Sequence, residues 1–191
     1  MSPTEKKNPL GPTGETVREN IKAHRERLRL GYTELSRRLQ DLGRPIPTLG
    51  LSRIEKGERR VDSDDLMALA AALEVSPITL LMPNDQNSSA ETRVVATGFP
   101  HRATAEELWH WLQAEEPISP PQRSGAETTD HPGGTARDDG FVARVKFRAI
   151  AMPYWKYVDI VQNLTPRQVA SIDFQTGMIR YVDDDTEEGQ G

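Results

Sequence analysis

The sequence predicts a mainly α protein, in which five short helices fill residues 15–83 and a smaller, partly disordered α+β region follows from residue 92. Three observations support this prediction. Apolar residues recur at helical spacing through the first half, glycines and helix-capping residues separate the segments, and stretches rich in proline and glycine interrupt the second half.

Composition narrows the class of protein. The 191 residues, 36% of them hydrophobic, can bury one good core or two small ones. The chain contains no cysteine, which excludes disulfides, cysteine-ligated zinc and thiol nucleophiles, and fits a reducing cytoplasm. No apolar run approaches the roughly 20 residues that cross a bilayer. We therefore expect a soluble, cytoplasmic protein without a membrane partner.

The net charge of −5 hides a division along the chain. Residues 16–60 hold 12 basic and 6 acidic residues, a local net charge of +6, whereas residues 84–191 hold 10 and 17, a net charge of −7. A basic segment within an acidic chain is typical of a local nucleic-acid-binding face.

Residues 1–14 contain three prolines and two glycines, and we expect a disordered tail there. A first helix is expected to begin near Glu15, and a second to run from Tyr32 to Leu42, where Gly43 ends it. Their apolar side chains recur three or four residues apart and predict one shared core: Val17, Ile21, Leu28, Leu35, Leu39 and Leu42.

A third, basic helix is expected from about Thr48 to Lys56, followed by Gly57. Leu51 and Ile54 form a narrow apolar stripe, which leaves the opposite side free. These residues alone leave two interpretations open: a helix that enters a groove of DNA, or an ordinary amphipathic helix with a solvated basic face.

Two further helices follow. Asp62 and the acidic residues after it predict the start of an alanine-rich helix that ends near Val75. Ser76 and Pro77 predict the start of a last short helix, which Pro83 ends.

The motifs L-S-R-R-L, S-R-I-E-K-G and D-L-M-A-L-A-A-A-L-E-V-S-P-I-T-L-L occur in this order within residues 16–83. The segment resembles the Cro/cI-type (XRE, lambda-repressor-like) helix-turn-helix family. This resemblance implies a five-helix lambda-repressor-like bundle that binds double-stranded DNA, with a recognition helix at about residues 48–56.

The resemblance also implies roles for particular residues. Base edges or adjacent phosphates would be contacted by Thr48, Leu49, Ser52 and Arg53. Phosphates would be contacted by Tyr32, Arg37, Arg38, Arg44, Lys56, Arg59 and Arg60. Glu55 would pair with Arg25 in a structural ion pair.

Two departures from the family pattern stand out. The recognition helix begins with Pro47, Thr48, Leu49 and Gly50 rather than polar side chains, so Leu49 would contact a thymine methyl and Gly50 would allow close backbone approach. The inserted G-R-P-I-P either places Arg44 on a phosphate or in a groove, or is a spacer with a solvated arginine.

The second half carries weaker signals. Residues 84–91 are expected to be a linker, and 92–183 a dimerisation or regulatory region with a mobile loop at 117–140. It would hold a short strand near Val94, a helix that Thr104 caps, and a hairpin turning at residues 175–177. Residues 141–152 fit a helix or a strand; we favour a helix that is interrupted at Pro153. An acidic, disordered tail is expected at 184–191.

The sequence thus favours a sequence-specific DNA-binding transcriptional regulator, a repressor acting as a homodimer. The alternative is an antitoxin-like module whose C-terminal half sequesters a protein partner, or binds an effector, while the N-terminal domain autoregulates. An enzyme is not expected, because the chain lacks a phosphate-binding glycine loop, H-E-x-x-H and G-x-S-x-G. Neither a cofactor nor a metal is expected.

Overall fold

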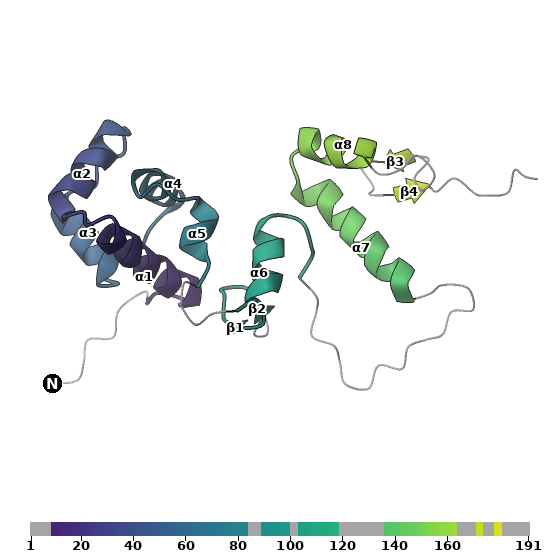
Figure 1. Ribbon diagram of the computed structural model, residues 1–191, viewed down its shortest axis with the longest axis horizontal. Helices are drawn as coiled ribbons and strands as arrows, with labels where there is room; N and C mark the ends of the chain where they lie inside the picture. Colours follow the sequence, from purple (N-terminus) through teal and green to yellow (C-terminus); the bar gives the residue numbers. More distant parts are fainter. Residues whose placement is uncertain are drawn as a thin grey trace, which may run out of the picture. The chain divides into compact units, whose positions relative to one another are not determined.

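The computed structural model describes residues 9–83, 89–99, 103–118, 136–163, 171–173 and 178–180. The protein is mainly helical, with eight helices and four short strands in these ranges. It divides into two compact units, Met1–Trp109 and His110–Gly191 (Figure 1). None of the described helices combines the length and apolar character needed to cross a membrane.

The N-terminal unit contains all five helices that the sequence predicts between residues 15 and 83. In order they are α1 (Pro12–Arg27), α2 (Tyr32–Asp41), α3 (Thr48–Glu55), α4 (Ser63–Ala72) and α5 (Pro77–Leu81). Helix α1 packs against α3 and α5, α2 packs against α3 and α4, and α4 packs against α5. Each helix therefore contacts at least two others and none stands apart.

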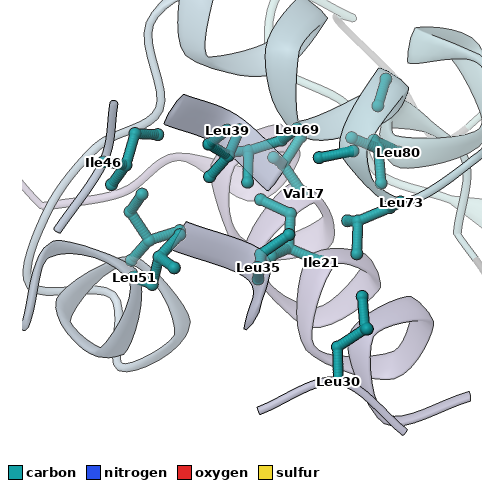
Figure 2. Packing of buried hydrophobic residues seen from close by; sticks show 13 residues of the cluster. Val17, Ile21, Leu30, Leu35, Leu39, Ile46, Leu51, Leu69, Leu73 and Leu80 are labelled. Atoms are coloured by element: carbon teal, nitrogen blue, oxygen red, sulfur yellow. The ribbon is translucent and has the colours of Figure 1, made fainter. Parts of the chain in front are cut away.

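One hydrophobic core lies between these helices, and Figure 2 shows its side chains from close by. Leu35 and Leu39 of α2 and Leu69 and Leu73 at α4 are fully buried. Of the side chains that the periodicity assigned to this core, Leu42 is the exception, because it caps the end of α2 and is 52% exposed. The apolar members of the core are Val17, Ile21, Leu30, Leu35, Leu39, Ile46, Leu51, Ile54, Leu69, Ala70, Ala72, Leu73 and Leu80.

The predicted caps of α4 and α5 are confirmed. The Asp62 carboxylate accepts a hydrogen bond from the Asp65 N–H at 2.7 Å, and the Ser76 hydroxyl accepts one from the Thr79 N–H at 3.2 Å. Each satisfies one backbone donor that a helix start leaves without an intrahelical partner.

The expected start of the first helix is wrong. Helix α1 begins at Pro12, with Gly11 as its N-cap, so part of the predicted tail is helical. Proline suits the first position of a helix because its fixed φ is helical and its missing N–H is not needed there. Residues 1–8 lie outside the described part of the chain.

A buried carboxylate connects the start of α4 to two preceding loops. Asp65 is 1% exposed and accepts hydrogen bonds from Arg44 Nε at 2.9 Å and from Arg59 Nη2 at 2.6 Å. Arg44 also donates to the Asp62 carboxylate at 2.9 Å. The Asp65 carboxylate raises the pKa of Arg44 above its usual value. This cluster fixes the inserted segment before α3 and the segment after it.

A short hairpin and a sixth helix complete the N-terminal unit. Strands β1 (Arg93–Val94) and β2 (Ala103–Thr104) pair antiparallel, and α6 (Ala105–Leu112) follows. Thr104 and Glu107 form the predicted reciprocal capping box, with hydrogen bonds of 2.7 and 3.1 Å. The Thr97 N–H donates to the Thr13 hydroxyl at 2.9 Å, so this segment packs on the start of α1. Residues 92–109 therefore belong with the first unit, not with the C-terminal region.

The C-terminal unit contains two further helices and a second hairpin. Helix α7 (Ala136–Ala151) confirms the helical interpretation of residues 141–152, and α8 (Tyr154–Asn163) follows the predicted break at Pro153. Residues 136–140 are helical, contrary to the expected loop. Strands β3 (Ser171–Asp173) and β4 (Met178–Arg180) pair antiparallel, as predicted. The predicted turn, the rest of the loop from residue 119, and the acidic tail lie outside the described residues.

Replacing Asp65 with asparagine is expected to lower the free energy of unfolding by about 2 kcal/mol, because Arg44 and Arg59 lose the anion between them. Chemical denaturation measures the loss. Asp64→Asn is the matched control, since Asp64 lies beside Asp65 but its side chain is 83% exposed and approaches Arg44 only to 3.9 Å. It should change stability by no more than about 0.5 kcal/mol. Equal effects from both variants would contradict the role of Asp65.

A buried histidine makes stability depend on pH. His24 is 8% exposed and neither ring nitrogen has a hydrogen-bond partner in the described residues. Burial, and secondarily the nearby charge of Arg27, lowers the pKa of His24 below 6.5. Below about pH 6.5 the unfolded chain therefore binds a proton that the folded chain does not.

We expect the free energy of unfolding to decrease as the pH falls through 6.5 toward the lower folded-state pKa, with no contribution from this group above about pH 7.5. Denaturation at a series of pH values measures this slope. His24→Leu should make the slope shallower, because the leucine has no proton to bind. An unchanged slope in the variant would assign the pH dependence to other groups.

Candidate nucleic-acid interface

Helix α3 presents two different faces. Leu51, Ile54 and Glu55 are buried against the rest of the unit. The opposite face carries the exposed Thr48, Leu49, Arg53 and Lys56 and the half-buried Ser52. Leu49 is 60% exposed, which is unusual for a leucine. All four residues that the resemblance assigned to base contacts thus lie on the side of α3 that faces away from the core.

The buried carboxylate of Glu55 fixes this orientation. It accepts two hydrogen bonds from Arg25 of α1, to Nε at 2.6 Å and Nη2 at 2.9 Å, and one from the Tyr32 hydroxyl of α2 at 2.8 Å. The Arg25 guanidinium also lies 4.6 Å from the centre of the Tyr32 ring. The Glu55 hydrogen bond raises the pKa of Arg25. One carboxylate therefore holds α3 to two other helices, and the expected pair of Arg25 and Glu55 is present.

Tyr32 is not placed as the sequence analysis expected. Its hydroxyl, assigned there to a phosphate, donates to Glu55 and also interacts with Ser52. Burial and this hydrogen bond to Glu55 raise the pKa of Tyr32. We therefore assign Tyr32 to the support of α3 and not to the interface. Ser52 remains half-buried at the edge of the outer face.

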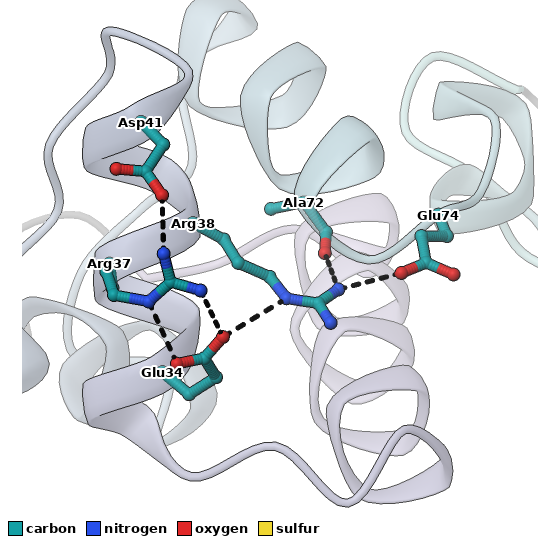
Figure 3. A network of polar contacts seen from close by, with 6 residues as sticks. All are labelled: Glu34, Arg37, Arg38, Asp41, Ala72 and Glu74. Carbon is teal, nitrogen blue, oxygen red and sulfur yellow. Dashed lines mark hydrogen bonds and ion pairs between the residues drawn. The ribbon is translucent and has the colours of Figure 1, made fainter.

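Two arginines of α2 lie in a polar network that Figure 3 shows. Arg38 donates to the Ala72 carbonyl at 3.0 Å and to the Glu74 carboxylate at 2.9 Å, which connects α2 to the end of α4. Arg37 is exposed and pairs with Glu34 and Asp41 of its own helix. Arg38 thus has a structural role in place of the expected phosphate contact. The ion pairs of Arg37 are exposed and contribute little to stability, so Arg37 stays a candidate for phosphate contact.

The other residues expected to contact phosphate fall into two groups, those held by a buried carboxylate and those that are exposed. Arg44 and Arg59 donate to the buried Asp65, so we no longer favour a phosphate contact for either, and the Arg44 side chain is 40% exposed and not fully solvated. Arg60 is exposed and donates to the Pro9 carbonyl. Lys56 is exposed, forms the C-cap of α3 and makes no ion pair within the described residues. Lys56, Arg60 and Arg37 remain the phosphate candidates.

Gly50 lies on the inner side of α3, contrary to the expectation that it would approach DNA. A Cβ added there would lie 2.9 Å from Arg59 Nη1 and 3.1 Å from Ile46 Cγ2. The absence of a side chain therefore makes room for Arg59 to reach across the first turn of α3.

Sequence reasoning missed three exposed cations on or just after α1. Lys22, Arg27 and Arg29 make no ion pair within the described residues, and Arg29 has a left-handed backbone with φ 54°. They were counted in the basic segment of residues 16–60. No signal in the sequence distinguishes them from the arginines that pair across helices.

Comparisons with known proteins add nothing to this assignment, since no family model, curated protein or solved structure matches the chain. Among the described residues no cluster of histidine, aspartate or glutamate side chains could hold a metal ion. His110 of α6 pairs instead with Glu115 at 2.7 Å.

Replacing Tyr32 with phenylalanine separates the two roles considered for this residue. We expect the free energy of unfolding to fall by about 1 kcal/mol, because Glu55 loses one hydrogen-bond donor. The salt dependence of DNA association should stay unchanged, because no phosphate contact is removed. Denaturation and titrations at several salt concentrations measure the two effects. A shallower salt dependence with unchanged stability would restore the phosphate role.

Proposed function

We propose that this protein is a sequence-specific DNA-binding transcriptional regulator, a repressor whose α3 is the recognition helix. The observation that carries the proposal is the outer face of α3, where Leu49, Arg53 and Lys56 are exposed while buried side chains on the opposite face fix the helix. A helix of this size with polar, apolar and cationic side chains on one face suits the major groove.

The proposal includes a lambda-repressor-like arrangement of α1 to α5. Supporting it are the five helices in the expected order, the contact of α2 with α3, and the pairing of Arg25 with Glu55. Ser36 of α2 also donates to the Ile46 carbonyl at 2.7 Å, which holds the segment before α3 against α2. The two helices of the proposed helix-turn-helix are thereby fixed to each other despite the inserted residues between them.

In this proposal the side chains of α3 have separate roles. Arg53 would donate two hydrogen bonds to a guanine, and Leu49 would contact a thymine methyl. Thr48 and Ser52 would contribute weaker polar contacts. Lys56, Arg60 and Arg37 would contact phosphates and supply most of the salt-dependent affinity.

Arg53→Ala is expected to reduce discrimination between the preferred and random duplexes by about 1–3 kcal/mol. Lys56→Ala should weaken binding to both alike and reduce the slope of log K against log salt by about 1. Fluorescence titrations of both duplexes over a range of salt concentrations measure these quantities. Lys156→Ala, an exposed change in the C-terminal unit, is the control and should alter neither. Equal losses for both α3 variants would refute the division of roles.

Selection of bound fragments from random DNA tests the function itself. We expect an inverted repeat whose half-sites lie about one helical turn apart, because a two-fold symmetric dimer reads both halves alike. A single asymmetric motif would contradict the dimer. The absence of salt-sensitive association with any duplex would refute the proposed function.

A role for the C-terminal unit in protein association is the second candidate. Three large apolar side chains are exposed around the break between α7 and α8: Ile150 at 80%, Tyr154 at 68% and Trp155 at 71%. Such exposed groups at one corner of a protein often mark an interface. We favour a second copy of the chain as the occupant, because it would provide the symmetry that an inverted repeat requires.

Light scattering of the full chain is expected to show a dimer that Trp155→Ser converts to monomer. Lys156→Ser, at the next exposed position, is the control and should leave the dimer intact. A monomeric parent protein would contradict self-association, and isolation of a stoichiometric partner protein would support the antitoxin-like alternative.

A further inference from the structure

A cleft of about 540 Å³ opens in the N-terminal unit beside the α3–α4 connection, where Arg59 and Asp62 of the Asp65 cluster line it. Its walls come from residues 9–14 and the first turns of α1, from residues 59–63 between α3 and α4, and from Leu66 and Leu81. The volume lies within the range of about 300–1,000 Å³ that small-molecule sites occupy in proteins. No role proposed above uses this cleft.

The walls of the cleft differ in character. Five of the side chains that line the cleft are aliphatic: Leu10, Val17, Val61, Leu66 and Leu81. Of the charged side chains, three are arginines and one is an aspartate, namely Arg18, Arg59, Arg60 and Asp62. At the start of α1 the Thr13 N–H donates to the Thr97 hydroxyl, and Glu15 lies in the first helical turn. The cleft therefore places three arginines, each with a carboxylate or carbonyl partner, beside an apolar floor.

The arginines are held in place by neighbouring groups. Arg59 donates through Nη2 to the buried Asp65, and Arg60 donates to the Pro9 carbonyl. Arg18 donates to the Glu15 carboxylate and to the Glu55 carbonyl. Because a guanidinium carries five N–H donors, these contacts position the Arg18 and Arg59 groups without using all of their donors. A fixed guanidinium loses little side-chain freedom on binding an anion.

We propose that this cleft binds a small amphipathic carboxylate, with an apolar body such as an aromatic ring or a short acyl chain. The carboxylate would lie among the three arginines, and the apolar body would contact Leu10, Val17 and Leu66. A carboxylate is the complementary head group because arginine binds it with two parallel hydrogen bonds. A neutral amide head would lack the charge that strengthens these hydrogen bonds.

Occupation of the cleft opposes DNA binding, a consequence that rests on the proposed function. Arg60 lies both on the cleft and among the candidates for phosphate contact, so a bound carboxylate and a phosphate compete for it. Arg59, also on the cleft, reaches across Gly50 in the first turn of α3. A ligand that redirects Arg59 therefore acts directly on the recognition helix.

Isothermal titration of the full chain with phenylbutyrate, without DNA, tests the site. We expect saturable binding of one equivalent, and binding of the neutral amide of the same acid that is about tenfold weaker. NMR should place the largest amide shifts at Gly14 and Val17. Absence of saturable binding, equal affinity for acid and amide, or shifts confined to other residues would overturn the proposal.

Two variants locate the ligand. Arg60→Gln should weaken phenylbutyrate binding about tenfold, whereas Arg27→Gln, an equally exposed arginine that does not line the cleft, should leave it unchanged. Val61→Trp should block the cleft, with a thermal melt to show that the variant is folded. If Val61→Trp is unfolded, the comparison of Arg60→Gln with Arg27→Gln decides whether the ligand binds in the cleft. Equal effects of these two variants on phenylbutyrate affinity would overturn the proposed site.

A duplex titration with saturating phenylbutyrate tests the regulation. We expect affinity for the selected duplex to fall about tenfold, and the amide to have no effect at the same concentration. Binding of phenylbutyrate without any change in duplex affinity would overturn the regulatory role. If the chain bound no duplex at all, the proposed function would fail, while the titrations without DNA would still decide whether the site exists.

Discussion

The orientation of α3 depends on the hydrogen bonds of one buried carboxylate. Glu55 projects from the inner face of α3 and accepts from Arg25 of α1 and from Tyr32 of α2. Removing one charge of a buried ion pair such as Arg25–Glu55 typically costs about 3–5 kcal/mol, because the remaining charge stays buried without its partner. Rotation of α3 about its axis would break these bonds. The outer face, from Thr48 to Lys56, is therefore directed away from the core by a polar constraint as well as by Leu51 and Ile54.

The same device appears at Asp65, and together the two groups change how the basic charge of the N-terminal unit should be counted. Of the 12 basic residues between positions 16 and 60, at least six form ion pairs with carboxylates in the described part of the unit: Arg18, Arg25, Arg37, Arg38, Arg44 and Arg59. The local net charge of +6 thus determines the electrostatic potential at a distance from the segment. It does not give the number of cations that can contact a ligand at its surface. The face that remains for a polyanion is narrower than the composition suggests.

The segment after α3, which contains Arg59 and Arg60, contacts both α3 and the cleft. On one side Arg59 packs over Gly50 and donates to Asp65, and on the other both arginines line the cleft beside α1. A segment that contacts both a proposed recognition helix and a cleft of ligand size is a short physical connection between two sites.

The sequence by itself located the helices and many of their ends, but not the starts of α1 and α7. Periodic apolar residues, Asp62, Ser76 and the glycines located five helices because these signals act within a few residues of one another. It also indicated the helix at 141–152 and the hairpin after it. The partners that connect the arginines to other segments were decided only by the tertiary structure. Arg38, Arg44 and Arg59 look like exposed cations in the sequence, yet the carboxylates and carbonyl that they reach in other segments lie 6 to 36 positions away. Pairing across helices depends on how the helices pack, and no local pattern records it. The cleft arises for the same reason, since its walls come from segments that meet only in the folded chain.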